Sequence, residues 1–267
     1  AHVVEALRGV LGLELDMRLD ADALVAGGVV GGSDDLHAAQ LNKLERICRK
    51  LELTADDHLL EIGTGWGSMA IYAAQHYGCR VTTTTLSQEQ YRLAEERIAQ
   101  AGLQDRITLL LKDYRELEGQ YDKLVSIEMV EAVGHAYFAT YFKACAALLK
   151  PDGLMLLQAI TIRDQRYEQA RRSVDFIQRY IFPGGYIPAL SEMIQGSEGT
   201  RLMVTDVEVL RLHYGLTIRE WYKRTMAHKA AIIALFDERF FRLWTFYLAG
   251  AATVFEHGGM VNYQVQY

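Results

Sequence analysis

Residues 58–67 combine a short apolar segment, an acidic residue and a turn in which every second residue is glycine. The apolar segment at 59–62 contains Glu61, and Gly63, Gly65 and Gly67 follow it. Glycines at these places let the backbone adopt left-handed torsions and pass close to a ligand. A helical pattern starts directly after Gly67. The sequence therefore predicts a strand, a tight turn and a helix, the arrangement in which nucleotide-binding sheets hold their ligands.

The spacing of these glycines limits the kind of nucleotide that the turn can hold. A dinucleotide fingerprint places its third glycine three residues after the second, whereas here it comes two residues after. The turn also lacks the Lys-Ser/Thr pair that holds a triphosphate. An acid followed by alternating glycines is the pattern expected for S-adenosylmethionine, whose sulfonium and amino groups are positive. Because glycine-rich turns also close ordinary strand–helix junctions, the motif needs support from other positions.

The rest of the chain alternates between strand and helix patterns. Apolar segments at 59–62, 81–86, 107–111, 123–129 and 154–160 are separated by helical patterns at 36–51, 68–77, 88–101 and 136–149, and a turn at 151–153 precedes the fifth strand. This alternation predicts βαβ units and an α/β fold with a doubly wound, mostly parallel sheet. Two further strands, at 204–210 and 260–267, bring the predicted number to seven.

The regular alternation ends after residue 162. Residues from 163 to about 203 are helical but irregular, with a break at Phe-Pro-Gly-Gly (182–185), and we interpret them as a helical insertion over the active edge of the sheet. Residues 217–255 are mostly helical. The predicted organisation is a partly irregular N-terminal segment, 1–35, followed by one domain, 36–267, that contains the insertion.

Two of the helices have recognisable starts. Asp34 or Asp35 precedes the helical pattern at 36–51, where either would serve as a cap. Ser87 precedes the pattern at 88–101, and Gln90 stands three residues later, which is the spacing of a capping box.

Charge and cysteine usage exclude several classes of protein. The formal net charge of -6 argues against a nucleic-acid partner, which favours a basic surface. The three cysteines, Cys48, Cys79 and Cys145, lie far apart, so neither a metal site nor a disulfide framework is indicated. No apolar run reaches the roughly 18 residues of a membrane span, and the first residues do not resemble a signal peptide. A reduced cytoplasm is the simplest compartment.

Polar residues that follow the predicted strands are the candidates for a site, because ligands of open parallel sheets bind at the carboxyl ends of the strands. These residues are Glu61, Thr85, Ser87, Gln90, Asp113, Tyr114, Glu128, Glu131 and Gln158. Hydroxyl and amide groups suit a ribose or a carboxylate, and an acid beside an aromatic residue suits an adenine. Each has a structural alternative: Gln90 as a helix cap, Asp113 as a turn residue, and the two later glutamates as a solvated pair.

Two further features bear on the chemistry. Glu131 stands among apolar neighbours, where a carboxylate is costly unless it is paired or functional, so we favour a functional role for it. The aromatic stretch at 240–248 is typical of a core, and it would equally suit the wall of a site for a long acyl chain.

Taken together, these segments resemble the cyclopropane-fatty-acid synthase family of S-adenosylmethionine-dependent methyltransferases, from about residue 36 to residue 267. The resemblance rests on the stretches Leu-Glu-Ile-Gly-Thr-Gly-Trp-Gly (60–67), Thr-Leu-Ser-Gln-Glu-Gln (85–90), Lys-Asp-Tyr-Arg (112–115), Tyr-Asp-Lys-Leu-Val-Ser-Ile-Glu-Met-Val-Glu-Ala-Val-Gly (121–134), Leu-Leu-Gln-Ala-Ile (156–160) and Ile-Gln-Arg-Tyr-Ile-Phe-Pro-Gly-Gly (177–185). Members of this family transfer a methyl group to the double bond of an unsaturated acyl chain on a phospholipid.

The resemblance also implies roles for individual residues. It assigns to the cofactor the residues Glu61, Ile62, Gly63, Thr64, Gly65, Trp66, Gly67, Thr85, Leu86, Ser87, Gln90, Asp113 and Tyr114. It makes Glu131, Ile160 and Tyr214 part of the site that holds a bicarbonate ion in cyclopropane-forming members, with Gln158 and Glu128 beside them. Tyr214 is matched by its place in His-Tyr-Gly-Leu-Thr (213–217).

Several positions depart from the cyclopropane-forming pattern. Those members usually carry Phe-Glu-His where this chain has Val-Glu-Ala (130–132), His where Gln158 stands, and Cys where Ala251 stands. Their His-Tyr-Asp and Tyr-Ser-Cys stretch has no counterpart between Leu19 and Ser33, so it is either absent from the protein or outside this chain. The glutamine form resembles a branch that makes methylene- and methyl-branched fatty acids. Methyl transfer is therefore expected, while ring closure is left open.

The expected mechanism begins with attack of the double bond on the methyl carbon, which leaves a carbocation that Glu131, Tyr214 and Glu128 would stabilise. A proton is then lost, to bicarbonate or to Glu131 itself, and neutral Gln158 favours a base other than a tightly held bicarbonate. The expected partners are unsaturated phospholipid acyl chains at the membrane surface, without nucleic acid and without a transmembrane span, and a homodimer is left open. The expected place is a bacterial cytoplasm, peripherally at the inner membrane. Two alternatives remain: methylation of a small amine or another lipid, and a silent cofactor- and lipid-binding protein.

Overall fold

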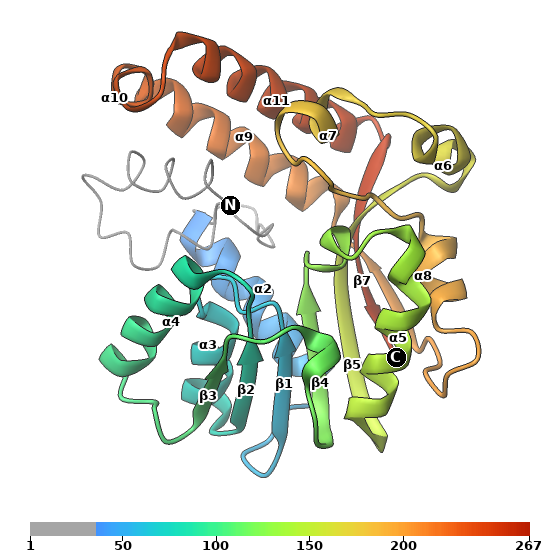
Figure 1. Cartoon of the computed structure of the whole chain (residues 1–267). Helices are drawn as coiled ribbons and strands as arrows, with labels where there is room; N and C mark the ends of the chain where they lie inside the picture. Colours follow the sequence, from blue (N-terminus) through green and yellow to red (C-terminus); the bar gives the residue numbers. More distant parts are fainter. Residues whose placement is uncertain (1–35) are drawn as a thin grey trace.

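Seven strands form one sheet in the order β3-β2-β1-β4-β5-β7-β6 in the computed structural model, which describes residues 36–267 (Figure 1). The strands are β1 (His58–Ile62), β2 (Arg80–Thr84), β3 (Ile107–Leu110), β4 (Tyr121–Ile127), β5 (Leu149–Ile162), β6 (Asp206–Val209) and β7 (Met260–Gln266). The first five run parallel, and β7 is antiparallel to both β5 and β6. The predicted fold class is thereby confirmed. The strand order reverses between β1 and β4, which is where an open α/β sheet binds its ligand.

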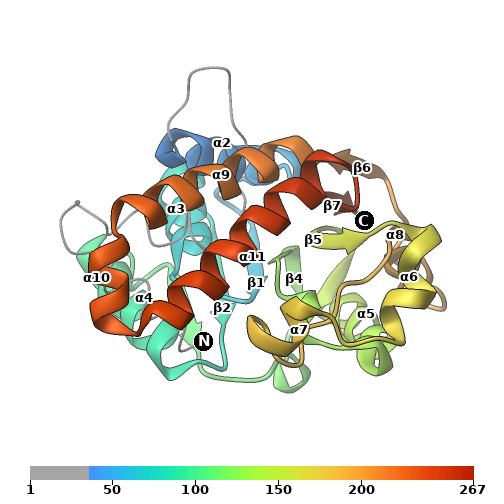
Figure 2. The ribbon, with the colours of Figure 1, turned by 90° about the horizontal axis from the view of Figure 1, so that it is seen from above.

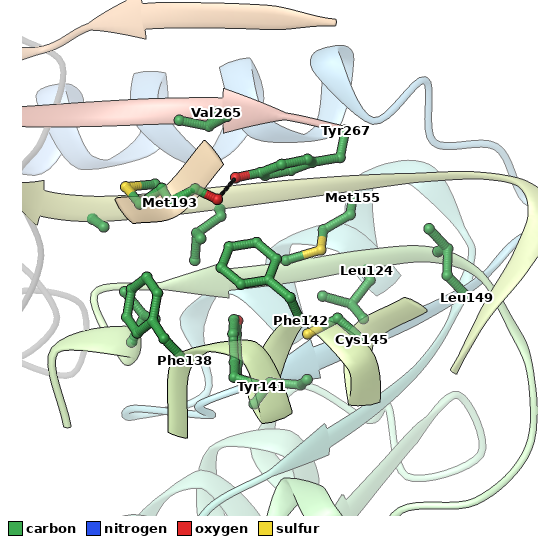
Figure 3. Close-up of a cluster of buried hydrophobic side chains, with 14 of the residues drawn as sticks. Leu124, Phe138, Tyr141, Phe142, Cys145, Leu149, Met155, Met193, Val265 and Tyr267 are labelled. Atoms are coloured by element: carbon green, nitrogen blue, oxygen red, sulfur yellow. Dashed lines mark hydrogen bonds between the residues drawn. The ribbon is translucent and has the colours of Figure 1, made fainter. Parts of the chain in front are cut away.

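Helices cover both faces of this sheet. The helices α2 (Leu36–Lys50), α3 (Ser68–Tyr77) and α4 (Gln88–Gln100) bury apolar side chains against one face. The other face is covered by α5 (Phe138–Leu148) and α8 (Leu190–Gly196). Figure 3 shows this second core, in which the hydroxyl of Tyr267 donates a hydrogen bond to the carbonyl of Met193 at 3.2 Å. The end of β7 is thus tied to α8.

A third apolar cluster covers the carboxyl edge of the sheet. It is built by α9 (Arg211–Ala227), α10 (Lys229–Leu235) and α11 (Glu238–Glu256), which lie above the strands in Figure 1 and cross over them in Figure 2. The insertion contributes α7 (Phe176–Tyr180), which contacts α11 through Phe176 and Phe246, and α6 (Asp164–Arg171), whose Tyr167 packs into the second core. The strand ends that carry the candidate residues therefore lie under a roof of helices.

Some predicted boundaries were wrong, for local reasons. β5 begins at Leu149 rather than at residue 154, because the predicted turn at 151–153 is a bulge: the pairing with β4 passes from Tyr121–Leu149 to Lys123–Leu154. α9 begins at Arg211 rather than at 217, directly after β6. β2 ends two residues early, at Thr84, and β4 ends at Ile127, so that Glu128 and Met129 leave the sheet.

Three short 3₁₀ turns add detail that the pattern does not show: Tyr114–Glu116, Val130–Ala132 and His135–Tyr137. The last of them takes up the start of the helix expected at 136–149. The proposed N-terminal segment 1–35 and the cap at Asp34 or Asp35 lie outside the described residues.

Candidate functional site

The glycine turn has the backbone conformation that its sequence predicts. Gly63, Gly65 and Gly67 have φ values of 104°, 53° and 89°, in the region where L side chains are strained. A Cβ atom at Gly65 would have no atom within 4 Å, so the turn is open there. At Gly63 a Cβ atom would lie 3.1 Å from the side chain of Met129. The turn after β1 therefore touches the segment after β4, on both sides of the strand-order reversal.

Glu61 is held below this turn. It is 2% exposed and accepts a hydrogen bond of 2.6 Å from the hydroxyl of Thr83, which also bonds the hydroxyl of Thr64 at 2.7 Å. A pocket of about 390 Å³, including its open mouth, is lined by Glu61, by the turn and by residues of α2. A fixed carboxylate at the floor of an open glycine turn fits a ligand with positive groups and a nucleoside.

The sequence reasoning missed two side chains that line this pocket and one that bonds residues of its lining. Gln40 and Lys43 of α2 line it and are 4% and 1% exposed. Arg97 of α4, 8% exposed, donates to the carbonyl of Trp66 at 2.6 Å and to the hydroxyl of Ser68 at 2.9 Å. In the sequence, these polar residues stand on the apolar faces of their helices. Because charged side chains are rarely buried without a partner, that position could have indicated them.

The residues after β2 form a small hydrogen-bonded unit. The hydroxyl of Ser87 accepts from the backbone nitrogen of Gln90 at 3.3 Å, so Ser87 caps α4 as predicted. The side chain of Gln90 accepts from the hydroxyl of Thr85 at 2.7 Å instead of returning to the Ser87 backbone. The capping box was therefore only half right. Leu86 between them is 70% exposed.

Asp113 and Tyr114 follow β3. The carboxylate of Asp113 accepts from the backbone nitrogen of Arg115 at 2.9 Å and forms a two-pronged ion pair with its guanidinium. This hydrogen-bonded guanidinium holds the pKa of Asp113 below its ordinary value. The ring of Tyr114 packs edge-on against Tyr141 at 5.4 Å. Both residues lie at the carboxyl edge with partners of their own, and their role toward a ligand stays a prediction.

The segment after β4 carries two carboxylates. Glu128 accepts hydrogen bonds from Gln158 Nε2 at 2.8 Å, from Asn262 Nδ2 at 2.7 Å and from the hydroxyl of Tyr214 at 3.3 Å. Its φ of 49° is a left-handed conformation that is unusual for a residue other than glycine. The alternative of a solvated pair does not hold for Glu128, since its carboxylate is bonded by side chains of three elements.

Glu131 lies in a drier place. Its Oε1 accepts from the backbone nitrogen of Ile160 at 2.6 Å, whereas Oε2 exposes less than 1 Å² and has no hydrogen-bond partner among the described residues. Burial, followed by the nearby charge of Glu128, raises the pKa of Glu131 to about 8. A carboxyl group with a pKa near neutrality suits an acid or base in a reaction.

Aromatic and aliphatic side chains surround these carboxylates. Tyr214 is 4% exposed, and burial raises its pKa well above the ordinary value, so its hydroxyl stays protonated and donates. Tyr214 belongs to the third apolar cluster, the one formed by α9, α10 and α11. Tyr247, Ile160 and Ile181 pack against this cluster. In the aromatic stretch at 240–248, Phe241, Trp244 and Leu248 are core, as one of the two interpretations expects, and Tyr247 lies near Glu128. The wall of an acyl-chain site stays a prediction.

The expected bicarbonate ion fits this site poorly. The two donors assigned to it, the Ile160 amide and the Tyr214 hydroxyl, already bind Glu131 and Glu128. A further anion would lie beside the carboxyl groups of both Glu128 and Glu131. The chain itself therefore supplies the carboxylates of the site.

Asn262 and Gln264 of β7 were also missed. Both are fully buried, Asn262 bonds Glu128, and Gln264 bonds Gln158. Residues that follow a strand lie at the carboxyl edge only where the strands are parallel, whereas β7 is antiparallel and brings its beginning to that edge. The alternation of polar and apolar residues in 260–266 was the available signal.

Within residues 36–267 the structure contains no group of three or more His, Cys, Asp or Glu side chains arranged to hold a metal ion. None of the helices described there is both long and apolar enough to cross a membrane.

Comparisons with known proteins agree with this geometry. Residues 31–265 match the family model described as mycolic acid cyclopropane synthetase. The chain is 41% identical over 232 residues to the tuberculostearic acid methyltransferase UfaA1 of Mycobacterium tuberculosis, covering 86% of this chain and 54% of that protein. It is 37% identical over 234 residues to the cyclopropane-fatty-acyl-phospholipid synthase of Escherichia coli, covering 87% of this chain and 59% of that protein. The chain thus spans little more than half the length of these relatives.

Among solved structures, the chain is similar to the mycolic acid cyclopropane synthase CmaA1 complexed with SAH and CTAB. The TM-score is 0.88 with 27% sequence identity, and the match covers 98% of this chain and 94% of that one.

Proposed function

Because the chain belongs to the mycolic acid cyclopropane synthetase family, we propose that it is a methyltransferase that acts on lipid. In this proposal it transfers a methyl group from S-adenosylmethionine to the double bond of an unsaturated fatty acyl chain of a phospholipid. The observation that carries the proposal is the placement of Glu131. A buried carboxyl group with a raised pKa and an unpartnered oxygen lies under an apolar roof, in the same segment as Met129, which lies against the glycine turn at Gly63.

The glycine turn and Glu61 would hold the donor, as the open space at Gly65 and the buried carboxylate indicate. The donor supplies an electrophilic methyl carbon when it is bound. An alkene is a weak nucleophile, so holding it in line with that carbon, dry and close, supplies much of the rate. The side chains of Ile160, Ile181 and Tyr247 offer the apolar walls for this purpose.

The carboxylates would act on the cation that the attack leaves on the acyl chain. Glu128 would be a fixed negative charge, and Tyr214, whose hydroxyl donates to Glu128, would add to the stabilisation. The unpartnered oxygen of Glu131 would accept the proton that is then lost. Loss from the added methyl carbon closes a cyclopropane, or leaves a methylene group if a hydride first shifts from the methylated carbon to the cationic carbon. Loss from a carbon of the chain leaves a methyl-branched chain with an internal double bond.

The phospholipid would be met at a membrane surface by the insertion and α11. Four large apolar side chains are exposed there: Val174, Tyr180, Phe182 and Phe246. The ring centroids of Phe176 and Phe246 are 5.0 Å apart, and those of Phe182 and Tyr247 are 5.8 Å apart. This surface is therefore continuous with Tyr247, one of the apolar walls proposed for the site. Residues 163–182 carry five arginines against three acidic residues in a chain of net charge -6. Exposed apolar side chains in a segment rich in arginine suit an anionic lipid surface. They support the proposal that the protein acts peripherally at the inner face of a bacterial membrane.

The test is incubation of the protein with labelled S-adenosylmethionine and vesicles that contain unsaturated phospholipid. Label in the acyl chains is the expected result, and NMR of the product distinguishes a ring from a methylene group. Label in a small amine, supplied in parallel, would replace the proposal by amine methylation. Absence of any transfer, with donor binding retained, would indicate a silent binding protein. Sedimentation of the same preparation determines whether it is a homodimer.

A further inference from the structure

Two amide side chains on β7 face the reaction site from behind. Asn262 pairs with Ile160 in the antiparallel register, and Gln264 pairs with Gln158. All three amide side chains, those of Asn262, Gln264 and Gln158, belong to residues with no exposed surface. Burying an amide in the middle of a sheet costs free energy unless the amide is hydrogen-bonded. The hydrogen bonds of Asn262 and Gln264 therefore explain why these residues are tolerated there.

The hydrogen bonds of these amides all lead toward the carboxylate of Glu128. Gln264 Nε2 donates to Gln158 Oε1 at 3.0 Å, and Gln158 Nε2 donates to Glu128 Oε1 at 2.8 Å. Asn262 Nδ2 donates to the same oxygen of Glu128 at 2.7 Å. Since a carboxylate only accepts, it determines the orientation of both amides that touch it. Gln264 in turn holds Gln158 in that orientation, because it occupies the oxygen end of the amide.

The backbone of Glu128 is held as firmly as its side chain. Its left-handed φ of 49° is costly for a side chain of this size. The backbone nitrogen of Glu128 donates to the carbonyl of Gln158 at 2.8 Å, so β5 holds both ends of the residue. A strained conformation that persists under several hydrogen bonds indicates that the direction of the side chain matters.

We propose that Asn262 and Gln264 are positioning residues that hold the Glu128 carboxylate as a fixed anion facing Tyr214 and Glu131. Asn262 acts directly on Glu128, and Gln264 acts through Gln158. The titratable groups that face Glu128 are Glu131 from the turn after β4, Tyr214 from α9 and Tyr247 from α11. This inference rests on the proposed function for its meaning in catalysis, but the contacts themselves are testable without any reaction.

The test is a pH titration by NMR of the full chain, labelled with carbon-13 at the glutamate carboxyl groups. The Glu128 signal is identified by its loss in Glu128→Gln. Hydrogen bonds to a carboxylate favour its charged form. Asn262→Leu and Gln264→Leu should therefore each move the Glu128 midpoint upward, by about one pH unit for Asn262, which bonds it directly. The isosteric Asn262→Asp preserves the shape of the site and places a second carboxyl group against Glu128, so the Glu128 signal should titrate in two coupled steps instead of at its wild-type midpoint.

The matched control is Gln266→Leu. Gln266 is on the same strand and bonds the carbonyl of Lys50, away from the carboxylates. Its removal should leave the Glu128 midpoint where it is. An unchanged midpoint in folded Asn262→Asp and Gln264→Leu would overturn the inference.

Activity separates this inference from the proposed function. In an active enzyme, the β7 variants should lower kcat about tenfold while leaving the affinity for S-adenosylhomocysteine unchanged. If wild-type protein transfers no methyl group, the proposed function fails, while the titration still decides whether β7 positions Glu128.

Discussion

Oε1 of Glu131 lies 2.6 Å from the backbone nitrogen of Ile160, while Oε2 of the same carboxyl group, buried, has no hydrogen-bond partner within residues 36–267. One oxygen thus orients the group, and the other is available to a substrate. The bond to Ile160 connects the segment after β4 to β5. Because the second oxygen is unpartnered, replacing Glu131 is the most informative substitution.

Replacing Glu131 by Gln should lower the rate of methyl transfer by roughly 100-fold or more, which is the usual contribution of a positioned proton acceptor. Calorimetry should show unchanged binding of S-adenosylhomocysteine, because the donor turn is not altered. Glu198→Gln, at an exposed position, is the control. Transfer at the wild-type rate by Glu131→Gln would contradict the assigned role.

The same residue should make stability depend on pH. The pKa of Glu131 rises from 4.5 to about 8 on folding, so between these values the folded state binds a proton that the unfolded state has lost. This contribution to stability is complete below about pH 4.5 and disappears as the pH rises through 8. The Tm of the wild type should therefore fall relative to that of Glu131→Gln between pH 5 and 9. Parallel Tm curves for the two proteins would refute the shift.

Removing the charge of Glu128 should alter the pH profile of the reaction. The negative charge of Glu128 is one of the two causes that raise the pKa of Glu131. The activity of the wild type should rise with pH around a midpoint near pH 8, the pKa of Glu131. In Glu128→Gln the midpoint of this rise should lie at a lower pH. Rates across pH 5.5–9.5 measure this. A profile centred at the same pH in both proteins would show that the two carboxyl groups are not coupled.

Glu61 should determine donor affinity rather than chemistry. Glu61→Gln keeps the shape of the side chain and removes its charge below the glycine turn. We expect S-adenosylhomocysteine to bind at least tenfold more weakly, a loss of about 1.4 kcal/mol, as measured by calorimetry. Glu95→Gln, exposed on α4, should bind as the wild type does. Equal affinity of the Glu61 variant would place the donor elsewhere.

The exposed aromatic residues beside α7 should matter for lipid only. Phe182→Ser with Phe246→Ser removes two large apolar side chains from the surface proposed to meet the membrane. Co-sedimentation with anionic vesicles should fall about tenfold or more, given the usual value of 1.5–3 kcal/mol for burying one such side chain. Val209→Ser, exposed on the edge strand β6, is the control. Undiminished sedimentation of the double variant would exclude this surface.

Much of the fold was readable in the sequence, because strands and helices of this kind carry local patterns. The turn at 63–67 needs glycines for its torsions, and all three glycines have positive φ. Ser87 caps its helix through a contact of three residues' span. The carboxyl ends of β1, β2 and β4 meet at one edge, so Glu61, Thr85 and Glu128 could be placed there in advance.

Long-range contacts could not be read in this way. The amides of Asn262 and Gln264 reach Glu128 and Gln158 across more than 100 residues of sequence. Lys43 lies at the pocket, and Arg97 bonds Trp66 and Ser68 of its lining, because of the way the helices pack. No local pattern reports which helix face meets which strand end.

The sequence by itself determines the glycine torsions, the helix cap and the acidic strand ends of this chain. These features depend on interactions between residues a few positions apart. The difference between Glu128 and Glu131 is of another kind. The two residues stand three positions apart, yet one is met by three donors from β5, β7 and α9, and the other keeps an unpartnered oxygen in a dry place. Burial and hydrogen bonding set the charge of a carboxyl group, and both arise only when distant segments pack together.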